Sequence, residues 1–239
     1  SVLNQTFRNF ELLIVDDGST DDTPQRVARH RNPLKYLSQA NKGVAAARNA
    51  GIQSSQGDLI CFLDSDDRWI KNKLEIQVEF MMSDPDIKIC YTGETWIRNG
   101  VRVDQKQVHR KYSGWIFQKC LPLCIISASS VMIHREVFAR VGLFDESMIV
   151  CEDYDLWLRI SRFYTISFIP EPLIMKYGGH HDQLSLRYLG MDVFRIKALE
   201  KILTENGLSE EDRNATIRML QKKCNILICG CYKHGRIED

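Results

Sequence analysis

The first part of the chain alternates short apolar runs with polar segments. Nearly continuous apolar runs occupy residues 10–15 and 58–63, with a shorter one at 34–37. Runs of this kind are typical of strands buried on both faces of a parallel sheet. The Ala-rich segment 43–54 lies between two of these runs and predicts a helix. We therefore expect alternating strands and helices joined by right-handed crossovers.

The pattern changes after residue 88. Segments 88–96 and 98–103 have the character of strands and flank Asn99-Gly100, a dipeptide that favours a tight hairpin turn. Further strands are expected at 129–134 and 173–177, and further helices at 152–163, at 192–203 and from 209 onward. This order predicts an α/β fold with a mixed, mostly parallel sheet flanked by helices, followed by a helical C-terminal tail.

Composition narrows the classes of function. The 239 residues are 44% hydrophobic and 26% charged, which is ordinary for a folded protein, and the formal net charge of +1 gives no support for nucleic-acid binding. No apolar run is long enough to span a bilayer, and the N-terminus lacks the pattern of a signal peptide. The eight cysteines form no C-x-x-C pair and are expected to be reduced thiols. We expect a cytoplasmic protein.

Two of the expected strands end in acidic residues, and ligands of such sheets bind beyond the carboxyl ends of the strands. Asp64 and Asp66 follow the run 58–63 and place carboxylates near one point. This spacing suits Mg²⁺ or Mn²⁺ bridging a diphosphate, and a polar turn explains it equally well. Asp16 and Asp17 follow the first run and could accept hydrogen bonds from a base or a ribose. Taken alone, this pair is better explained by an Asp-Gly turn.

Three other places could carry chemistry. Arg48 could face a phosphate or point to solvent. Glu152 and Asp153 stand in the first turn of a predicted helix, whose dipole favours negative charge. Asp153 could therefore act as a general base, or the two acids could merely cap the helix. His180 and His181 point in different directions, so at most one should bind a metal, and either could be an ordinary loop residue.

Several segments of the chain resemble, in the same order, those of family 2 glycosyltransferases with the GT-A fold. The matching segments are residues 1–7, 10–12, 15–21, 41–43, 48–51, 62–67, 138–146 and 152–159. The resemblance implies a GT-A domain at 1–190 and a helical extension at 191–239. Within that domain, it implies a nucleotide-sugar-binding half at 1–100 and an acceptor-binding half at 101–190.

The resemblance also implies roles for individual residues. Asp153 would be the catalytic base, with Glu152 beside it in the acceptor site. The implied metal ligands are Asp66 and Asp64, joined by His180 or His181. The residues implied for nucleotide-sugar binding are Asp16, Asp17, Asn41, Lys42, Gly43, Arg48, Asn49, Asp64 and Ser65. In this assignment Asp17 contacts the base of the donor and Asp64 lies on the ribose side.

The activity implied by the resemblance is sugar transfer with inversion from a nucleotide-diphosphate sugar, UDP being the expected nucleotide. The acceptor would be a hydroxyl of a glycan or of a lipid-linked sugar, as in polysaccharide biosynthesis, and Mn²⁺ or Mg²⁺ would neutralise the departing diphosphate. Peripheral contact with the inner face of a membrane is left open. Acceptor specificity is expected in residues 104–123, where Trp115 is expected in the core rather than stacked on a sugar.

Two alternatives from other classes stay open. One is an inactive module that binds nucleotide sugars. The other is a nucleotidyltransferase, although the Gly-rich, basic N-terminal loop typical of that class is not visible in this sequence. Transfer from labelled donors would separate an enzyme from a binding module.

The start of the chain differs from the family's usual pattern, in which a buried strand and a turn precede a helix that leads into a segment like residues 1–5. Ser1 already falls in that helix. We therefore expect a truncation of roughly two dozen residues, the usual length of a strand, loop and helix. We also expect weaker nucleotide binding and lower stability, because neighbouring strands would be left with unpaired backbone groups.

Overall fold

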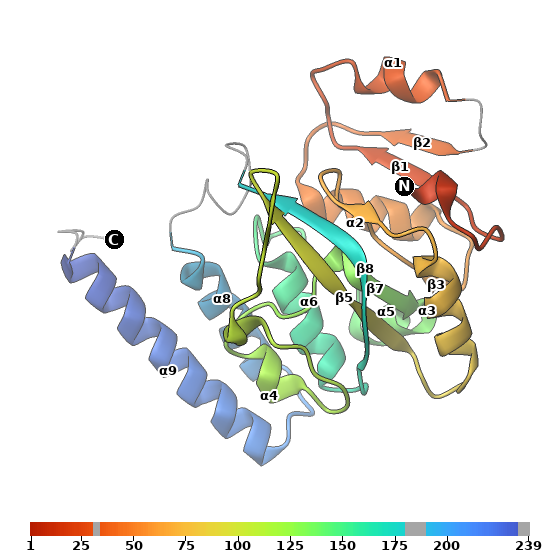
Figure 1. Cartoon of the computed structure of the whole chain (residues 1–239). Coiled ribbons are helices and arrows are strands. Elements are labelled where there is room, and N and C mark those ends of the chain that lie inside the picture. Colours follow the sequence, from red (N-terminus) through yellow and green to blue (C-terminus); the bar gives the residue numbers. More distant parts are fainter. Residues whose placement is uncertain (31–33, 180–189, 234–239) are drawn as a thin grey trace.

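The computed structural model describes residues 1–30, 34–179 and 190–233, and the ribbon in Figure 1 follows them in chain order. The α-helices are α1 (Thr23–Ala28), α2 (Val44–Ser54), α3 (Lys73–Met82), α4 (Phe117–Cys120), α5 (Arg135–Val141), α6 (Glu152–Ser161), α8 (Asp192–Thr204) and α9 (Glu210–Lys233). Short 3₁₀ helices are η1 (Val2–Asn4), η2 (Gln107–His109) and η3 (Ala128–Ser130). The strands are β1 (Leu13–Asp16), β2 (Lys35–Ser38), β3 (Leu59–Ile60), β4 (Arg68–Trp69), β5 (Ile89–Arg98), β6 (Val101–Val103), β7 (Val131–His134) and β8 (Ser167–Gly178).

These strands form two sheets. β1 and β2 pair in parallel, whereas the larger sheet has the order β3-β7-β5-β8-β4, with β6 attached to β5. The expected α/β class with a mixed sheet is confirmed. However, within the larger sheet only β5 and β8 pair in parallel among the described strands, and the other pairs are antiparallel. Parallel pairing is less extensive than expected because β3, β4 and β6 all pair antiparallel with their neighbours.

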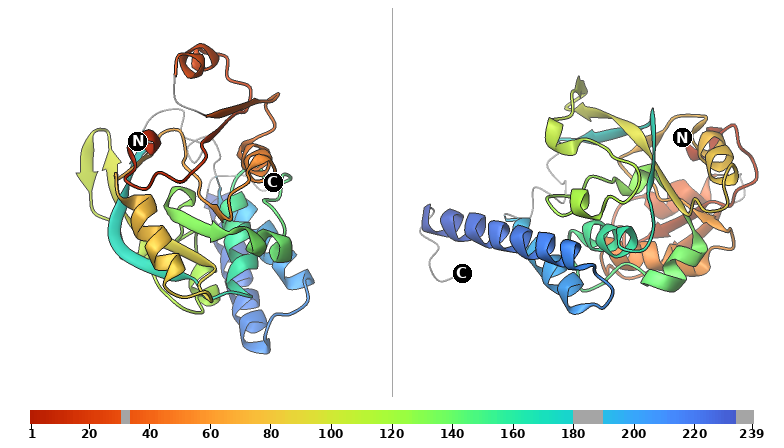
Figure 2. Two further views of the ribbon diagram at one scale, coloured as in Figure 1. Left: turned by 90° about the vertical axis from the view of Figure 1, so that its right-hand side faces the viewer. Right: turned by 90° about the horizontal axis from the view of Figure 1, so that it is seen from below.

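Apolar layers cover both faces of the larger sheet. Side chains alternate along a strand, so neighbours on β5 belong to different layers. Tyr91 packs with the residues of α5, α6 and α8, while Cys90 packs with Trp69 and with Leu74 of α3. The two views in Figure 2 show helices on either side of this sheet and the pair β1–β2 beside it. The larger sheet, packed on both faces, therefore supports the loops that follow its strands.

Helix α6 is the most deeply embedded helix in the described part of the chain. Nine of its residues are buried, and Asp153 is the one that is not. The Trp157 indole donates to the Ile126 carbonyl at 3.0 Å, and the Tyr154 hydroxyl donates to the Leu121 carbonyl at 2.6 Å. Satisfied buried polar groups of this kind fix a helix in one position. The first turn of α6 is thus held firmly.

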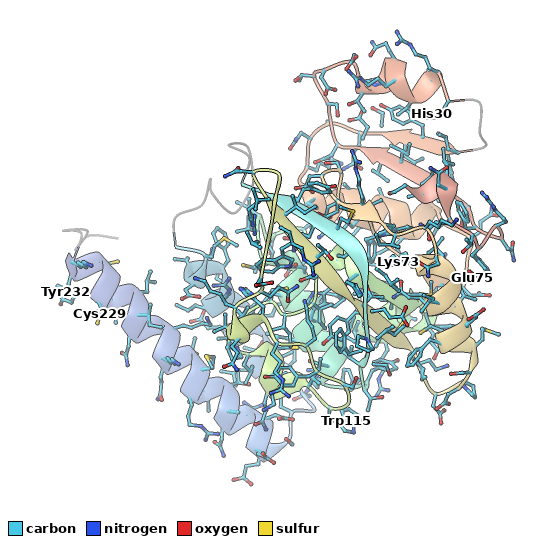
Figure 3. The ribbon with its side chains drawn as sticks, in the orientation of Figure 1. His30, Lys73, Glu75, Trp115, Cys229 and Tyr232 are labelled. Atoms are coloured by element: carbon cyan, nitrogen blue, oxygen red, sulfur yellow. The ribbon has the colours of Figure 1, made fainter. Side chains whose placement is uncertain are left out.

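The C-terminal helices differ in burial. α8 contributes Ala198, Leu199 and Ile202 to the core, whereas in the 24-residue α9 only Thr216 and Lys223 are buried. Figure 2 shows α9 as a rod that extends from the body, and Figure 3 places Tyr232 and Cys229 near its outer end. Within the described residues, we find no helix whose length and apolar character would let it cross a bilayer. The domain boundary at 190/191 stays a prediction.

Local predictions had different outcomes. The hairpin at Asn99-Gly100 is confirmed, with φ values of 50° and 79° that suit such a tight turn. In contrast, the run 58–63 pairs only through Leu59 and Ile60, although Phe62 and its neighbours still pack against the two cores. The expectation that Trp115 lies in the core is wrong. Its side chain is 70% exposed and lies near the lower edge of Figure 3, directly after Gly114, which has φ +95° and forms a β-bridge with Ile166.

Candidate active site

The acids at the end of β1 are held by their own chain. Asp16 is buried, and its carboxylate accepts hydrogen bonds from the Ser19 amide at 2.7 Å and from the Tyr36 hydroxyl on β2. Both hydrogen bonds lower the pKa of Asp16, and the one from Tyr36 has the larger effect. An ionised Asp16 therefore fixes the turn at residues 16–19 against β2.

Asp17 joins this turn to the segment that begins α2. Its carboxylate accepts hydrogen bonds from the Gln39 side chain at 2.7 Å and from the Lys42 and Gly43 amides at 2.9 and 2.7 Å. Between the two segments, Gly18 has φ +80°, and a Cβ there would stand 2.8 Å from the Asn41 amide nitrogen. The expected donor-site residues Asp17 and 41–43 are thus neighbours, and Asn41 and Lys42 are exposed.

The acids that follow β3 lie in a more open turn. Ser65 and Asp66 are exposed, while Asp64 is half-buried and its Oδ1 accepts a hydrogen bond from Arg48 at 2.7 Å. Burial works to raise the pKa of Asp64, but Arg48 and then Lys176 bring it below its usual value. Asp64 is therefore an ionised carboxylate, and the exposed carboxylate of Asp66 follows it two residues later.

Asp67, the last acid of this turn, is buried and accepts a hydrogen bond from the Tyr177 amide of β8 at 3.1 Å. Burial, followed by the charge of Asp64, raises the pKa of Asp67 to about 6. The same segment continues directly into β4, which pairs with β8. Asp67 therefore anchors the acidic turn to the larger sheet.

Arg48 connects the acidic turn to α6. Its guanidinium lies 2.7 Å from Asp64 Oδ1 and 2.5 Å from Glu152 Oε1, and it covers the Phe144 ring at 5.3 Å. Burial works to lower the pKa of Arg48, but Asp64 and Glu152 outweigh it and raise that pKa. The sequence left open whether Arg48 faces phosphate or solvent; the structure instead places it in a nearly buried bridge between two carboxylates.

Asn49 supports this bridge from the next position of α2. Its side chain accepts a hydrogen bond from the Phe144 amide at 3.0 Å and donates to the Phe144 carbonyl at 2.9 Å. It also donates to the Glu146 carboxylate at 2.8 Å. These bonds fix the loop whose aromatic ring packs under Arg48, so the described contacts of Asn49 place it beneath the site.

Glu152 and Asp153 begin α6 and have different surroundings. Glu152 is buried, and burial followed by the charge of Asp153 raises the pKa of Glu152 despite its ion pair with Arg48. The Asp153 carboxylate is half-buried and accepts hydrogen bonds from the Tyr154 amide at 2.7 Å and from the Cys124 thiol at 3.3 Å. It lines a cavity of about 130 Å³. Asp153 is thus the acid of this pair that a substrate can approach.

The metal assignment has support only from the donor atoms. Asp64 and Asp66 bring carboxylate oxygens to one turn, and such oxygens are the donors that Mg²⁺ and Mn²⁺ prefer. Across the described residues there is no group of three or more histidine, cysteine or acidic side chains that could hold a metal ion. His180 and His181 lie outside the described residues. The carboxylate pair fits the chemistry of these ions.

Sequence reasoning missed three charged residues around the cavity. Glu94, Lys111 and Lys176 line it together with Asp153, although they come from distant parts of the chain. For Glu94 the sequence did contain a signal, because a charged residue stood within a predicted strand, where charges are rare unless they are paired. Lys176 carried the same signal, since it falls within the strand expected at 173–177, whereas no comparable signal marked Lys111.

The chain is similar to known glycosyltransferases. It is 38% identical over 175 residues to an uncharacterized glycosyltransferase of Rickettsia conorii, covering 72% of this chain and 29% of that protein. It is 36% identical over 171 residues to the UDP-Glc:alpha-D-GlcNAc-diphosphoundecaprenol beta-1,3-glucosyltransferase WfgD of Escherichia coli, covering 71% of this chain and 65% of that protein. The chain thus spans less than two thirds of the length of these relatives.

Solved structures show the same fold. That of S. aureus TarS 1–349 in complex with UDP-GlcNAc superposes with a TM-score of 0.72 at 21% identity, covering 94% of this chain and 66% of that chain. This likeness confirms the expected GT-A fold. The sequence pattern of the family described as glycosyl transferase family 2 matches residues 1–142. This match spans more than half of the sequence, so the chain belongs to glycosyl transferase family 2.

Proposed function

We propose that this chain transfers a sugar from a nucleoside diphosphate sugar to an acceptor hydroxyl, with Asp153 as the general base. One observation carries the proposal: Asp153 is the only residue of α6 that is not buried, and it lines a cavity beside the acidic turn. The names of the relatives support a glycosyl transfer, and UDP is the nucleotide named for both WfgD and the TarS complexes.

The donor side is formed by the ends of β1 and β3. The rigid turn around Asp17 and the exposed segment at Asn41 and Lys42 offer polar groups to a nucleoside, in keeping with ligand binding beyond strand ends. Ser65 is exposed nearby. In this proposal Asp16 and Asn49 act by positioning, because their described hydrogen bonds lie within the protein.

A divalent cation, Mn²⁺ or Mg²⁺, belongs to this proposal. Asp64 and Asp66 are the described residues that would hold it, and when bound it would supply positive charge to the diphosphate. Arg48 keeps Asp64 ionised and oriented. The participation of His180 or His181 stays a prediction, as does a cytoplasmic location.

The chemical step is a single displacement. Asp153 takes the proton from the acceptor hydroxyl as its oxygen forms a bond to the anomeric carbon of the donor. The bond from that carbon to the diphosphate oxygen breaks on the opposite face, and its electron pair leaves with the nucleoside diphosphate, so that the configuration inverts. The Cys124 thiol and the Tyr154 amide orient the carboxylate of Asp153. The acceptor would be a glycan or a lipid-linked sugar.

A donor panel tests this function. UDP-, GDP- and dTDP-sugars are incubated with the protein, Mn²⁺ and a mixture of methyl glycosides as acceptors, and release of nucleoside diphosphate is measured. We expect release from a UDP-sugar, and loss of release in Asp153→Asn. The exposed acid Asp58 provides a matched control, since Asp58→Asn changes the same functional group away from the site. Nucleotide binding with no release from any donor would instead indicate a binding module.

A further inference from the structure

The cavity beside Asp153 is enclosed by elements that do not take part in the donor side. Its walls come from β5, β8, the segment around residues 109–111 and the segment 124–127, and its volume is about 130 Å³. Arg48, Asp64 and Asp66 are not among the residues that line it. A cavity of this size takes one small polar ring rather than a nucleotide. Because Arg48, Asp64 and Asp66 do not line it, we place it on the acceptor side of the proposed base.

Glu94 is the least satisfied polar group in this cavity. Its side chain is 2% exposed, and its Oε1 accepts hydrogen bonds from the Lys111 ammonium and the Trp96 indole, both at 2.9 Å. Its other oxygen, Oε2, is buried with no hydrogen-bond partner in the described part of the chain. A buried carboxylate oxygen without a partner is rare and costly. A hydroxyl donor from a ligand would satisfy it.

The surroundings of Glu94 are rigid. Lys111 also donates to the Ile125 carbonyl at 2.6 Å, and Lys176 donates to the Ser127 hydroxyl at 3.1 Å. Burial works to raise the pKa of Glu94, but Lys111 and Lys176 hold that pKa below its usual value. The cavity thus presents an ionised acceptor, ammonium donors and the side of an indole. This mixture suits a ring with several hydroxyl groups.

We infer that this cavity binds the sugar unit of the acceptor, and that Glu94 determines its specificity by accepting a hydrogen bond from one of its hydroxyls. The ring would then present a neighbouring hydroxyl to Asp153, which lines the same cavity. The inference rests on the proposed function, because it names the substrate class of the same site. Lys111 acts as a positioning residue that fixes the orientation of the Glu94 carboxylate.

The variant Glu94→Gln separates recognition from structure. A glutamine would keep its oxygen toward Lys111 and Trp96, since both are donors, and would turn its amide NH₂ into the cavity. One acceptor is thereby replaced by a donor while the internal contacts persist. The exposed Glu171 on β8 provides the matched control Glu171→Gln.

The assay measures UDP released from UDP-glucose in Mn²⁺, without acceptor and with methyl glycosides of glucose, galactose, N-acetylglucosamine and glucuronic acid. Release without acceptor reports hydrolysis of the donor, and the increase caused by a glycoside reports its use as acceptor. In Glu94→Gln, we expect kcat/KM for the active glycoside to fall on the order of 10- to 100-fold, the loss expected for a hydrogen bond to a charged group. Hydrolysis and the KM for UDP-glucose should stay unchanged, whereas the melting temperature should fall, because a neutral glutamine no longer balances the charges of Lys111 and Lys176.

Each other outcome has a defined meaning. An unchanged response to the glycosides in Glu94→Gln overturns the inference. So does a higher KM for UDP-glucose with an unaltered acceptor response, because the cavity would then hold the sugar of the donor. If the wild type hydrolyses UDP-glucose but responds to no glycoside, the inference fails and the donor chemistry stands. Absence of both UDP binding and UDP release would remove the proposed function, and the inference with it.

Discussion

At the end of β1, Asp16 and Asp17 accept hydrogen bonds from within the chain, whereas at the end of β3 Asp66 is exposed and Asp64 is bridged to α6 by Arg48. Both pairs follow apolar runs, so their sequences look alike. Their structural settings differ because the segment after β2 returns across the end of β1 and offers its amides there. One pair of acids mainly holds the fold, and the other is placed to meet ligands.

The same division recurs within α6. Glu152 is buried in an ion pair, and its neighbour Asp153 faces the cavity. A carboxylate that the protein itself uses should therefore affect stability when it is changed. A carboxylate that faces the site should instead affect binding or rate. Four substitutions test this distinction.

The largest effect is expected from Asp153→Asn. Asparagine has nearly the same shape and keeps the contact with the Tyr154 amide, but it cannot take a proton at neutral pH. We expect transfer to fall by roughly 10²-fold or more, with donor affinity and melting temperature unchanged. The measurement is UDP release with and without acceptor, beside Asp58→Asn. Transfer within a few-fold of the wild type would move the base elsewhere, with Glu152 as the next candidate.

Asp66→Ala should act on donor binding alone. Asp66 is exposed, so its removal should leave the fold intact while removing a ligand of the proposed cation. We expect the affinity for UDP in Mn²⁺ to fall on the order of 10-fold or more, since even indirect partners of metal ligands contribute that much. Calorimetry with Mn²⁺ and with EDTA measures the change. Equal UDP affinity in both conditions, or in variant and wild type, would contradict the metal assignment.

Asp17→Asn should reduce the stability of the fold as well as donor binding. One or more of the hydrogen bonds from Gln39 and from the Lys42 and Gly43 amides would be lost, because an amide has a single acceptor oxygen. We expect the free energy of unfolding to fall by about 1–2 kcal/mol, together with weaker donor binding. Urea denaturation measures this loss, with Asp66→Asn as the matched control. A stable Asp17→Asn protein would show that the contrast between the two strand ends is mistaken.

The smallest expected effect is the contribution of Glu152 to the pH dependence of folding stability. Burial and the charge of Asp153 raise the pKa of Glu152 above 4.5 in the folded state, so the folded protein binds this proton more tightly than the unfolded chain. The corresponding stability is present below pH 4.5 and is lost as pH rises through the raised pKa. Relative to Glu152→Gln, the wild type should therefore become less stable over that interval. Urea denaturation at several pH values measures the difference, and parallel pH profiles would argue against a raised pKa.

Local order in the chain was largely predictable. The hairpin at Asn99-Gly100 and the buried helix at α6 follow from turn chemistry and apolar periodicity, which act over a few residues. The run 58–63 shows the limit of such patterns. The run was expected to be buried on both faces, but only Ile60 is buried, its other apolar side chains are partly buried against the cores, and only Leu59 and Ile60 pair with β7. Apolar character reports burial, and it does not specify which backbone groups find a partner.

The candidate site was predictable only in part. The resemblance singled out Asp153 and the acids at both strand ends, and their roles stay predictions. The bridge from Arg48 to Glu152 joins residues 104 positions apart, and no local pattern encodes such a contact. Trp115 illustrates the reverse error, because it was expected in the core, whereas its side chain is 70% exposed beside the bridge between Gly114 and Ile166. Contacts made by folding thus decide which polar residues share a cavity.

The Arg48 bridge predicts that the two proposed substrates bind cooperatively. One guanidinium is shared between Asp64, on the donor side, and Glu152, beside the proposed base. In the proposed site, a ligand that draws Asp64 away would strengthen the interaction of Arg48 with Glu152 and so change the charge next to Asp153. Thermodynamic linkage makes this coupling reciprocal. If bound donor changes the affinity for the acceptor by some factor, bound acceptor changes the affinity for the donor by the same factor. In Arg48→Met, this cooperativity between the two substrates should disappear.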